Sequence, residues 1–274
     1  MSYDLHQPAS LDEALALAAR LGEDAHFMAG GTALVLLMAQ GLVRPAHVIS
    51  LRRVPELRGI QRDPDGTLRI GAMATHRECE RADAVRAHCA ALAETFAHVA
   101  TVRIRNQATV GGNLAHADPA QDPPPMLIAL GASAIVVGPG GSREIPLDAF
   151  FSDTFTTALA PGEILREVRV PPLPAGARAT YVKYLPRTHD DYATVSVAAA
   201  ATHDGVRVAL GGVGPTPLRA REVEDALARG SAIDDAAALV DGAIDPIDDA
   251  RGSAAYKRDM ARVWTARALS EVLS

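Results

Sequence analysis

The sequence predicts an α+β protein of two domains, and three features of the chain lead to this expectation. Over residues 1–174, helical and strand-like patterns alternate in two successive groups, which we expect to form two α/β lobes of about residues 1–56 and 57–174. The stretch "PPLPAG" at 171–176 then reads as a linker, because paired prolines interrupt both helix and sheet. Beyond it, residues 175–274 hold three strand-like runs followed by helices, which predicts a smaller C-terminal domain with a three-stranded antiparallel sheet.

The first lobe is expected to alternate helix and strand. Ser10 and Glu13 form a capping-box pattern at the start of a helix that Gly22 ends. "HFMAGG" reads as a short buried strand that runs into a glycine turn, and Thr32 is expected to cap the next helix, which stops at Gly41. "HVISL" predicts a further short strand.

The second lobe begins with the turn "DPDG" and the strand-like run "TLRIGA". Thr75 and Glu78 then form a second capping-box pattern, and an alanine-rich stretch predicts one long helix over about 83–98. After a loop over 108–122, "PPMLIALG" is expected to be helical and "ASAIVVG" to be a strand.

The C-terminal domain is expected to open with the strands "TYVKYLPR", "ATVSVAAAATH" and "VRVALGGV". Asp204-Gly205 between the last two is a hairpin signal. A long helix should run from Ser253 to the C-terminus, and one side of it is expected to pack through Tyr256, Met260, Val263, Trp264 and Arg267.

Composition narrows the classes of protein and partner. The chain has 274 residues, 48% of them hydrophobic, which is ample for a packed core, and its net charge of −6 argues against nucleic-acid binding. The two cysteines, Cys79 and Cys89, fit neither a CxxC pair nor a zinc site, and they are too few to ligate an iron–sulfur cluster. The N-terminus lacks the pattern of a signal peptide, and the apolar runs are shorter than the roughly 20 residues of a membrane helix. We therefore expect a cytoplasmic protein without a membrane span.

Two glycine pairs, Gly30-Gly31 and Gly111-Gly112, are the main candidates for a binding site. Glycine permits unusual backbone angles and lets a ligand approach backbone N–H groups, which suit an anion at the start of a helix. One such loop is weak evidence, but two can hold both phosphates of a pyrophosphate. The chain lacks G-x-x-x-x-G-K-[ST], and no G-x-G-x-x-G follows its first strand, so a flavin dinucleotide in another architecture is indicated.

These loops stand in a longer series of recognisable motifs. "AGGTALVLLM", "GAMATH", "TVGGNLAHADPAQDPPPMLIALGA", "PGEIL" and "GGVGPTPLRA" occur in this order and span nearly the whole chain. The series resembles the FAD-binding medium subunit of the molybdenum hydroxylases, the family of xanthine dehydrogenase and aerobic carbon monoxide dehydrogenase. The resemblance implies a two-lobed FAD-binding domain of the PCMH type over 1–174 and the flavoprotein C-terminal domain over 175–274.

The resemblance also implies which residues contact FAD. A first glycine loop would wrap the pyrophosphate and the adenosine side, and a second would complete the pyrophosphate site. Asp122 would bond a ribose hydroxyl. The isoalloxazine ring would lie among two apolar, two polar and one aromatic residue. The residues concerned are Ala29, Gly30, Gly31, Thr32, Ala33 and Leu34 in the first loop, Thr109, Gly111, Gly112 and Asn113 in the second, and Ile164, Leu165, Lys183, Asp190 and Tyr192 around the ring.

Simpler interpretations stand beside several of these roles. Ala33 replaces a polar residue that family members often carry, which would remove a side-chain contact but no backbone contact. Asp122 precedes three prolines and could cap a turn or the next helix. Lys183 could be a solvent-facing strand residue, and Tyr192 could be a buried tyrosine with a bonded hydroxyl. We expect no metal ligand and no acid–base catalytic residue in this chain, because the reaction would belong to the flavin.

As a function, the resemblance implies the flavoprotein subunit of a multi-subunit molybdenum hydroxylase. A large subunit would carry molybdopterin, a small subunit would carry two [2Fe–2S] clusters, and the complex would be a dimer of heterotrimers. FAD would accept electrons from the clusters and pass them to an external acceptor. Two alternatives are an FAD-free binding or assembly protein of the same fold and a self-contained flavin oxidase. The substrate, which the large subunit would select, and the acceptor are not defined by this sequence.

Overall fold

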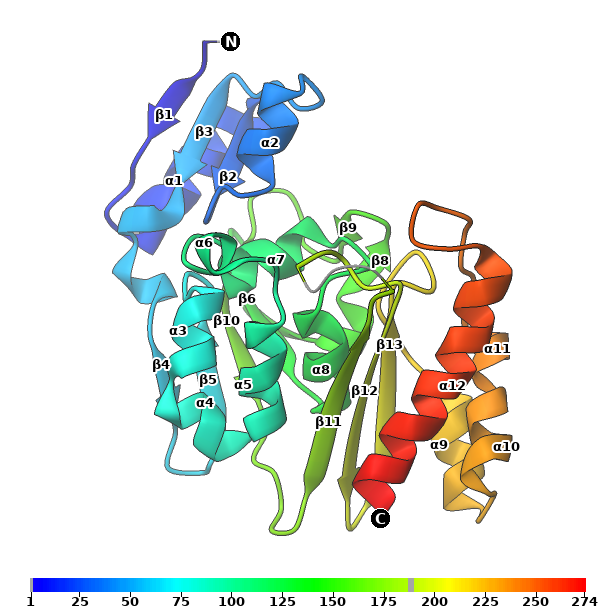
Figure 1. Ribbon diagram of the computed structural model, residues 1–274. Coiled ribbons are helices and arrows are strands. Elements are labelled where there is room, and N and C mark those ends of the chain that lie inside the picture. Colours follow the sequence, from blue (N-terminus) through cyan, green and yellow to red (C-terminus); the bar gives the residue numbers. More distant parts are fainter. Residues whose placement is uncertain (1, 187–189) are drawn as a thin grey trace.

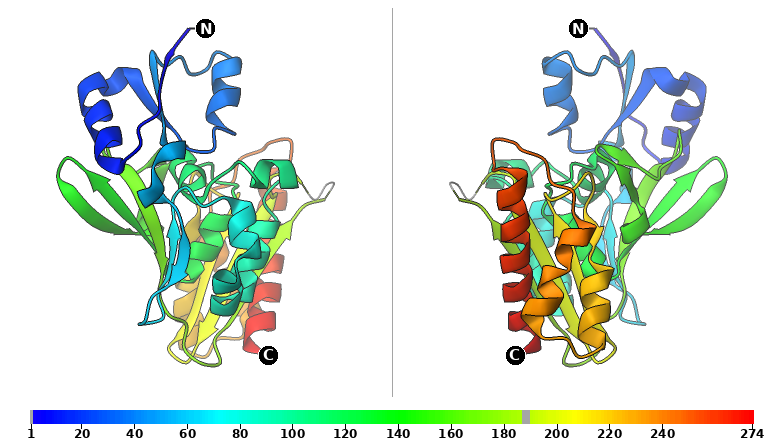
Figure 2. Two further views of the ribbon diagram at one scale, coloured as in Figure 1. Left: turned by 90° about the vertical axis from the view of Figure 1, so that its left-hand side faces the viewer. Right: turned by 90° about the vertical axis from the view of Figure 1, so that its right-hand side faces the viewer.

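The computed structural model describes residues 2–186 and 190–274 and has four layers, sheet, helices, sheet and helices, below a small separate lobe (Figure 1). The first lobe stands at one end of the molecule, and the C-terminal end of the chain lies at the other (Figure 2). Between these ends, helices of the second lobe lie between a five-stranded sheet and the sheet of the C-terminal region. The α+β expectation is confirmed.

The first lobe is a small parallel sheet with the strand order β1-β3-β2. Ser10 caps its first helix by accepting a hydrogen bond from the Glu13 amide at 3.1 Å, and Gly22 ends that helix with φ of 59°, as the sequence predicts. The elements are β1 (Asp4–His6), α1 (Leu11–Leu21), β2 (Ala25–Met28), α2 (Leu34–Ala39) and β3 (His47–Ser50).

The second lobe is built on an antiparallel sheet with the order β4-β5-β10-β6-β7. The predicted capping box forms, because Thr75 and Glu78 each bond the backbone amide of the other. The strands are β4 (Ile60–Arg62), β5 (Leu68–Gly71), β6 (Ser133–Gly138), β7 (Gly141–Pro146), β8 (Phe151–Asp153), β9 (Thr156–Thr157) and β10 (Ile164–Val170). The helices are α3 (His76–Arg81), α4 (Asp83–His88), α5 (Ala90–Ala97), α6 (Val102–Arg105), α7 (Val110–His116) and α8 (Pro123–Ala129).

The C-terminal region is an antiparallel sheet, β11-β12-β13-β14, with helices on one face. The face away from these helices packs on α8, so alternate residues of β12 enter different cores: Ala198 and Ala200 join the second lobe, while Val197 and Ala199 join the helices. The elements are β11 (Arg178–Tyr184), β12 (Val195–Thr202), β13 (Gly205–Gly211), β14 (Leu218–Arg219), α9 (Arg221–Ala228), α10 (Ile233–Ala238), α11 (Val240–Ala243) and α12 (Ala254–Leu273).

Three sequence-based expectations about these elements are wrong. The helix expected over 83–98 is two helices, because Cys89 adopts an extended conformation with φ of −157° and ψ of 111°. The last sheet has a fourth strand, β14, which pairs two residues with Ala209 and Leu210. In α12 the fully buried residues are others than expected, namely Lys257, Ala261, Thr265, Ala268, Leu269 and Val272. Of the five residues expected to pack, Met260 and Trp264 are partly buried against the same core, whereas Val263 and Arg267 are exposed.

Candidate functional site

The first glycine loop, residues 29–34, connects β2 to α2 with its backbone amides unused by the rest of the protein. Gly31 has φ of +77°, a conformation that glycine adopts without strain. Among the described residues, the amides of residues 30–34 donate no hydrogen bond to a protein acceptor. The expectation that Thr32 caps α2 is wrong, since the cap position is Ala33 and no side chain bonds there. A run of free N–H groups on a glycine turn is a fitting environment for an anion.

The second glycine loop, residues 109–113, forms the first turn of α7 and uses its own amides internally. Thr109 caps the helix by accepting from the Gly112 amide at 3.1 Å. The amides of Val110 and Gly111 donate to the carbonyls of Ala74 and Ala72 at 2.9 and 2.8 Å. This loop is therefore fixed to the second lobe, and its free polar group is the side-chain oxygen Oδ1 of Asn113, which is buried without a protein partner.

The two glycine loops touch each other, and glycine is what permits the contact. A Cβ atom on Gly30 would lie 2.0 Å from the carbonyl oxygen of Gln107, two residues before the second loop. A Cβ atom on Gly112 would lie 2.9 Å from Thr109 Oγ1 and 3.1 Å from the Cβ of Ala29. The 2.0 and 2.9 Å contacts are shorter than real Cβ contacts, and the 3.1 Å contact would require Ala29 to shift. Glycine at both positions therefore lets the first lobe lie close to the second. Together the loops form one continuous surface between the lobes.

Two candidate residues from distant parts of the sequence meet beyond α7. Asp122, the residue before α8, is 4% exposed, and its Oδ2 lies 3.0 Å from the Nζ of Lys183 on β11. The Tyr181 hydroxyl donates to the other carboxylate oxygen at 2.7 Å. Lys183, whose side chain is 2% exposed, also donates to the His98 carbonyl at 2.9 Å. Asp122 occupies the N-cap position of α8, but its side chain makes no capping hydrogen bond, and the Lys183 side chain is buried, so neither simpler interpretation describes these side chains.

Burial dominates the electrostatics of this ion pair. It raises the pKa of the Asp122 carboxyl, because the charged form loses water, while Lys183 and the Tyr181 hydroxyl act in the opposite direction. Burial also holds the pKa of Tyr181 well above its usual value, and the Asp122 charge adds to this effect. Tyr181 thus stays a hydrogen-bond donor at physiological pH. The sequence analysis missed it, although Tyr181 and Lys183 are two apart on one strand and so share a face.

The remaining candidates occupy two different surroundings. Tyr192 is 43% exposed, and partial burial together with the nearby carboxylates of Asp118 and Asp122 raises its pKa to about 12. Asp190 is exposed in the loop before it. Ile164 and Leu165, at the start of β10, are buried in cores, and Ile164 packs with residues of the first lobe. Tyr192 is therefore an accessible aromatic group, whereas Ile164 and Leu165 belong to the buried cores.

These residues suit a flavin dinucleotide. The free amides of the first loop match a pyrophosphate, and the orphaned Oδ1 of Asn113 needs a donor that the protein does not supply. Asp122 and Lys183 add a paired polar group, and Tyr192 adds an exposed ring. Within 2–186 and 190–274, no cluster of three His, Cys, Asp or Glu residues is arranged to hold a metal ion. None of the described helices has the length and apolar character to cross a membrane.

Comparison with known proteins shows the family of the chain. Residues 1–173 match the family model of the FAD binding domain in molybdopterin dehydrogenase, and residues 180–272 match that of the CO dehydrogenase flavoprotein C-terminal domain. The fold and the site thus define an FAD-dependent oxidoreductase subunit. The chain belongs to the flavoprotein, or medium-subunit, family of the molybdenum hydroxylases.

Individual relatives cover almost the whole chain. The carbon monoxide dehydrogenase medium chain of Hydrogenophaga pseudoflava is 38% identical, over 98% of this chain and 96% of its own length. The 6-hydroxypseudooxynicotine dehydrogenase complex subunit alpha of Paenarthrobacter nicotinovorans is 34% identical, over 99% and 95%. The solved structure of carbon monoxide dehydrogenase from Hydrogenophaga pseudoflava superposes with a TM-score of 0.94 at 36% identity, covering 100% of this chain and 98% of that one.

Proposed function

We propose that this chain holds FAD between its two lobes, takes electrons from the iron–sulfur clusters of a partner subunit and passes them to an external acceptor. The observation that carries the proposal is the run of unused amides at residues 30–34, which lies against the first turn of α7. The flavin supplies the redox chemistry when it is bound. The protein binds it, orients it and controls access to it.

At the pyrophosphate end, the first glycine loop is proposed to donate its backbone amides to the phosphates. The amides of the second glycine loop already have protein partners. This loop, with Thr109, Gly111 and Gly112, is therefore proposed to hold the first loop in position beside the phosphates. Asn113 would turn its unpaired Oδ1 to a donor of the cofactor. Since these contacts are mainly backbone contacts, Ala33 need not weaken the site.

Asp122 and Lys183 are proposed to form a polar part of the site, with Asp122 at a ribose hydroxyl and Lys183 at the edge of the flavin ring. Each carboxylate oxygen of Asp122 accepts one protein hydrogen bond and keeps capacity for a second, which a ribose hydroxyl can use. Lys183 and Asp190 would lie at the polar edge of the ring and Tyr192 near its face, with Ile164 and Leu165 behind. The exposure of Tyr192 supports a role at the surface through which electrons leave.

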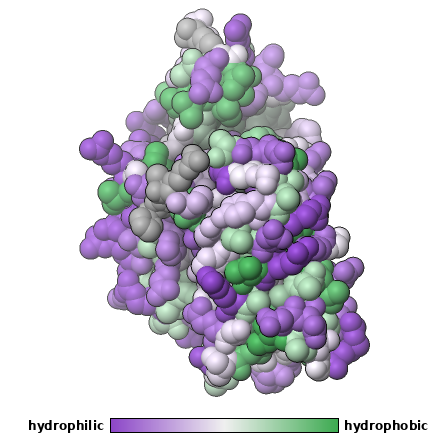
Figure 3. All heavy atoms as spheres, turned by 45° about the vertical axis from the view of Figure 1, so that its right-hand side comes forward, coloured by the Kyte–Doolittle hydropathy of each residue, from purple (hydrophilic) through white to green (hydrophobic). Residues whose placement is uncertain are grey.

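The chain is further proposed to work in the cytoplasm in a dimer of heterotrimers. Its partners would be a large molybdopterin subunit and a small subunit with two [2Fe–2S] clusters. An apolar surface on the first lobe supports a partner there: Val35, Leu36 and Leu42 are each more than half exposed, and Figure 3 shows apolar residues gathered on this lobe. The ranges of the two family models support domains of 1–174 and 175–274.

The substrate is proposed to be chosen by the large subunit and not by this chain. Relatives named for carbon monoxide and for 6-hydroxypseudooxynicotine are 38% and 34% identical to this chain. Its sequence is therefore about equally similar to subunits from complexes named for different substrates. No pocket specific to one substrate is needed here for the proposed role.

A tagged copy of the chain, purified from its native host, tests this proposal. We expect one flavin per chain by visible spectroscopy, all of it released by denaturation, together with iron and molybdenum in the purified complex. A folded but colourless chain would support the FAD-free binding or assembly protein instead. A yellow chain that oxidises a substrate without iron or molybdenum would support the self-contained oxidase.

A further inference from the structure

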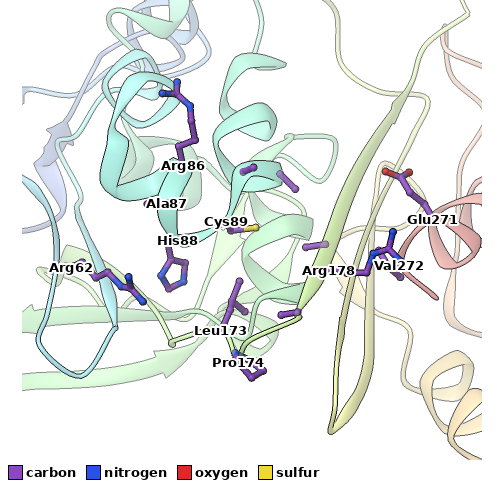
Figure 4. A pocket seen from close by; sticks show the side chains of 14 residues that line it. Arg62, Arg86, Ala87, His88, Cys89, Leu173, Pro174, Arg178, Glu271 and Val272 are labelled. Carbon is purple, nitrogen blue, oxygen red and sulfur yellow. The ribbon is translucent and has the colours of Figure 1, made fainter. Parts of the chain in front are cut away.

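A cavity lies between the second lobe and the C-terminal sheet, away from the glycine loops. It measures about 540 Å³, and Figure 4 shows it between the junction of α4 and α5, the linker and the start of β11. The end of α12 closes its other side with Glu271 and Val272. A cavity of this size at a junction of structural units suits a small molecule.

Positive charge dominates the lining. Arg62 on β4, Arg86 on α4 and Arg178 on β11 contribute three guanidinium groups, and Glu271 contributes the carboxylate side chain. The three arginines come from elements far apart in the sequence, so only the folded protein brings them together. Such a lining favours an anionic ligand over a cation.

The three arginines differ in how far the protein already uses their charge. Arg86 forms an ion pair with Asp83, and in Figure 4 its side chain extends away from the linker. Arg178 donates to the carbonyl oxygen of the C-terminal Ser274. Arg62 donates to a backbone carbonyl but forms no ion pair within the described parts of the chain. Arg62 therefore remains available for an anion.

His88 gives an independent sign of a missing partner. The residue is 8% exposed, and neither of its ring nitrogens makes a well-formed hydrogen bond within the described structure, although the Pro171 carbonyl lies close to the ring. Its ring projects into the region between Arg62 and Leu173 (Figure 4). Burial and the Arg62 charge lower the pKa of His88 against the opposing effect of the Pro171 carbonyl, so the ring is neutral and carries one N–H donor. A buried donor beside a guanidinium without a carboxylate partner is costly unless an acceptor joins them.

We propose that this cavity binds a small molecule that carries a phosphate group. Its tetrahedral oxyanion accepts hydrogen bonds from Arg62 and His88, and Arg178 adds a further cation. The remainder of the molecule lies along the apolar surface of Leu173, Pro174 and Val272. This site is separate from the proposed FAD site and does not depend on it.

Calorimetric titration of the full chain with inorganic phosphate tests the proposal, with chloride at equal ionic strength as the reference. Arg62 is exposed, so Arg62→Gln should leave the fold intact while weakening phosphate binding roughly tenfold. The matched control is Arg53→Gln, an exposed arginine of the first lobe outside the cavity, which should bind phosphate like the unmodified chain. Equal phosphate affinity in the two variants, or no heat beyond that of chloride, overturns the proposal.

Repeating the titration with saturating FAD separates this cavity from the glycine loops, which could also attract phosphate. We expect the same phosphate affinity with and without FAD, and the same loss in Arg62→Gln. Displacement of phosphate by FAD would put the anion at the glycine loops and overturn the assignment. A chain that fails to bind FAD leaves the Arg62 comparison valid, so the two proposals fail separately.

Discussion

Replacing Lys183 with methionine is the sharpest perturbation of the site, because it removes one charge from a buried pair and keeps most of the side-chain volume. Asp122 would remain 4% exposed with the Tyr181 hydroxyl as its remaining side-chain donor. Breaking a buried ion pair from one side typically costs about 3–5 kcal/mol, since an uncompensated charge stays in the interior. We expect a loss of this size in the free energy of unfolding at pH 8.

The loss should depend on pH in a defined direction. Burial already raises the pKa of Asp122 against the opposing effect of Lys183, so removing the lysine raises it further. A carboxyl with a higher pKa in the folded than in the unfolded state binds more protons when folded. The free energy of unfolding therefore falls as pH rises from the unfolded value of about 3.9 to the folded pKa. The free energy of unfolding that Lys183→Met loses should be smallest near pH 5 and largest near pH 8.

Urea unfolding of the FAD-free chain, followed by circular dichroism at both pH values, measures this effect. The matched control is the double variant Asp122→Asn/Lys183→Met, in which the Tyr181 hydroxyl still finds an acceptor and no charge is buried. It should recover most of the lost stability at pH 8. An equal loss at pH 5 and pH 8, or a double variant less stable than Lys183→Met, would refute the reasoning.

Three further predictions concern the glycine contact, the exposed tyrosine and a buried histidine. Gly30→Ala should lose FAD, because its methyl group would lie 2.0 Å from the Gln107 carbonyl oxygen, whereas Gly140→Ala meets no atom within 4 Å and should keep full flavin content. Tyr192→Ala should keep FAD but change the rate of flavin reoxidation, and an unchanged rate in stopped-flow measurements would argue against its place near the ring. His76 is fully buried, and burial lowers its pKa to about 3, so the folded protein loses stability as pH falls from 6.5 towards that value. In His76→Leu the free energy of unfolding should fall less steeply with falling pH, by up to about 1.4 kcal/mol per pH unit. An unchanged pH profile of urea unfolding would contradict the lowered pKa of His76.

Local signals in the sequence were enough to predict much of the fold. The capping patterns at Ser10 and Thr75 form as expected, because each depends on side chains within one helical turn. The break at Cys89 had no such signal, since alanine-rich sequence favours helix on both sides and tertiary packing decides where the chain bends. In α12 the packing on β11 and β12 decides which side of the helix is buried, so Lys257 and Leu269 are covered whereas Val263 is exposed.

The site was predictable where backbone chemistry alone defines it. Glycine pairs identify both loops, but the sequence could not show that Gly30 and Gly112 serve the contact between the loops. Nor could it show that amides of the second loop donate to the carbonyls of Ala72 and Ala74. The pairing of Asp122 with Lys183 joins residues 61 positions apart and depends on the packing of the C-terminal sheet against α5 and α8. These properties arise from tertiary structure and have no counterpart in a local motif.

Electron transfer through the flavin of this subunit is the central claim, and one comparison tests it most directly. The complex purified with the unmodified chain and the complex purified with flavin-free Gly30→Ala are each reduced anaerobically and then mixed with an acceptor dye that accepts electrons from reduced flavin. We predict that the iron–sulfur clusters of both complexes are reduced, and that only the flavin-containing complex reduces the dye rapidly. Equal rates of dye reduction in the two complexes would contradict the account.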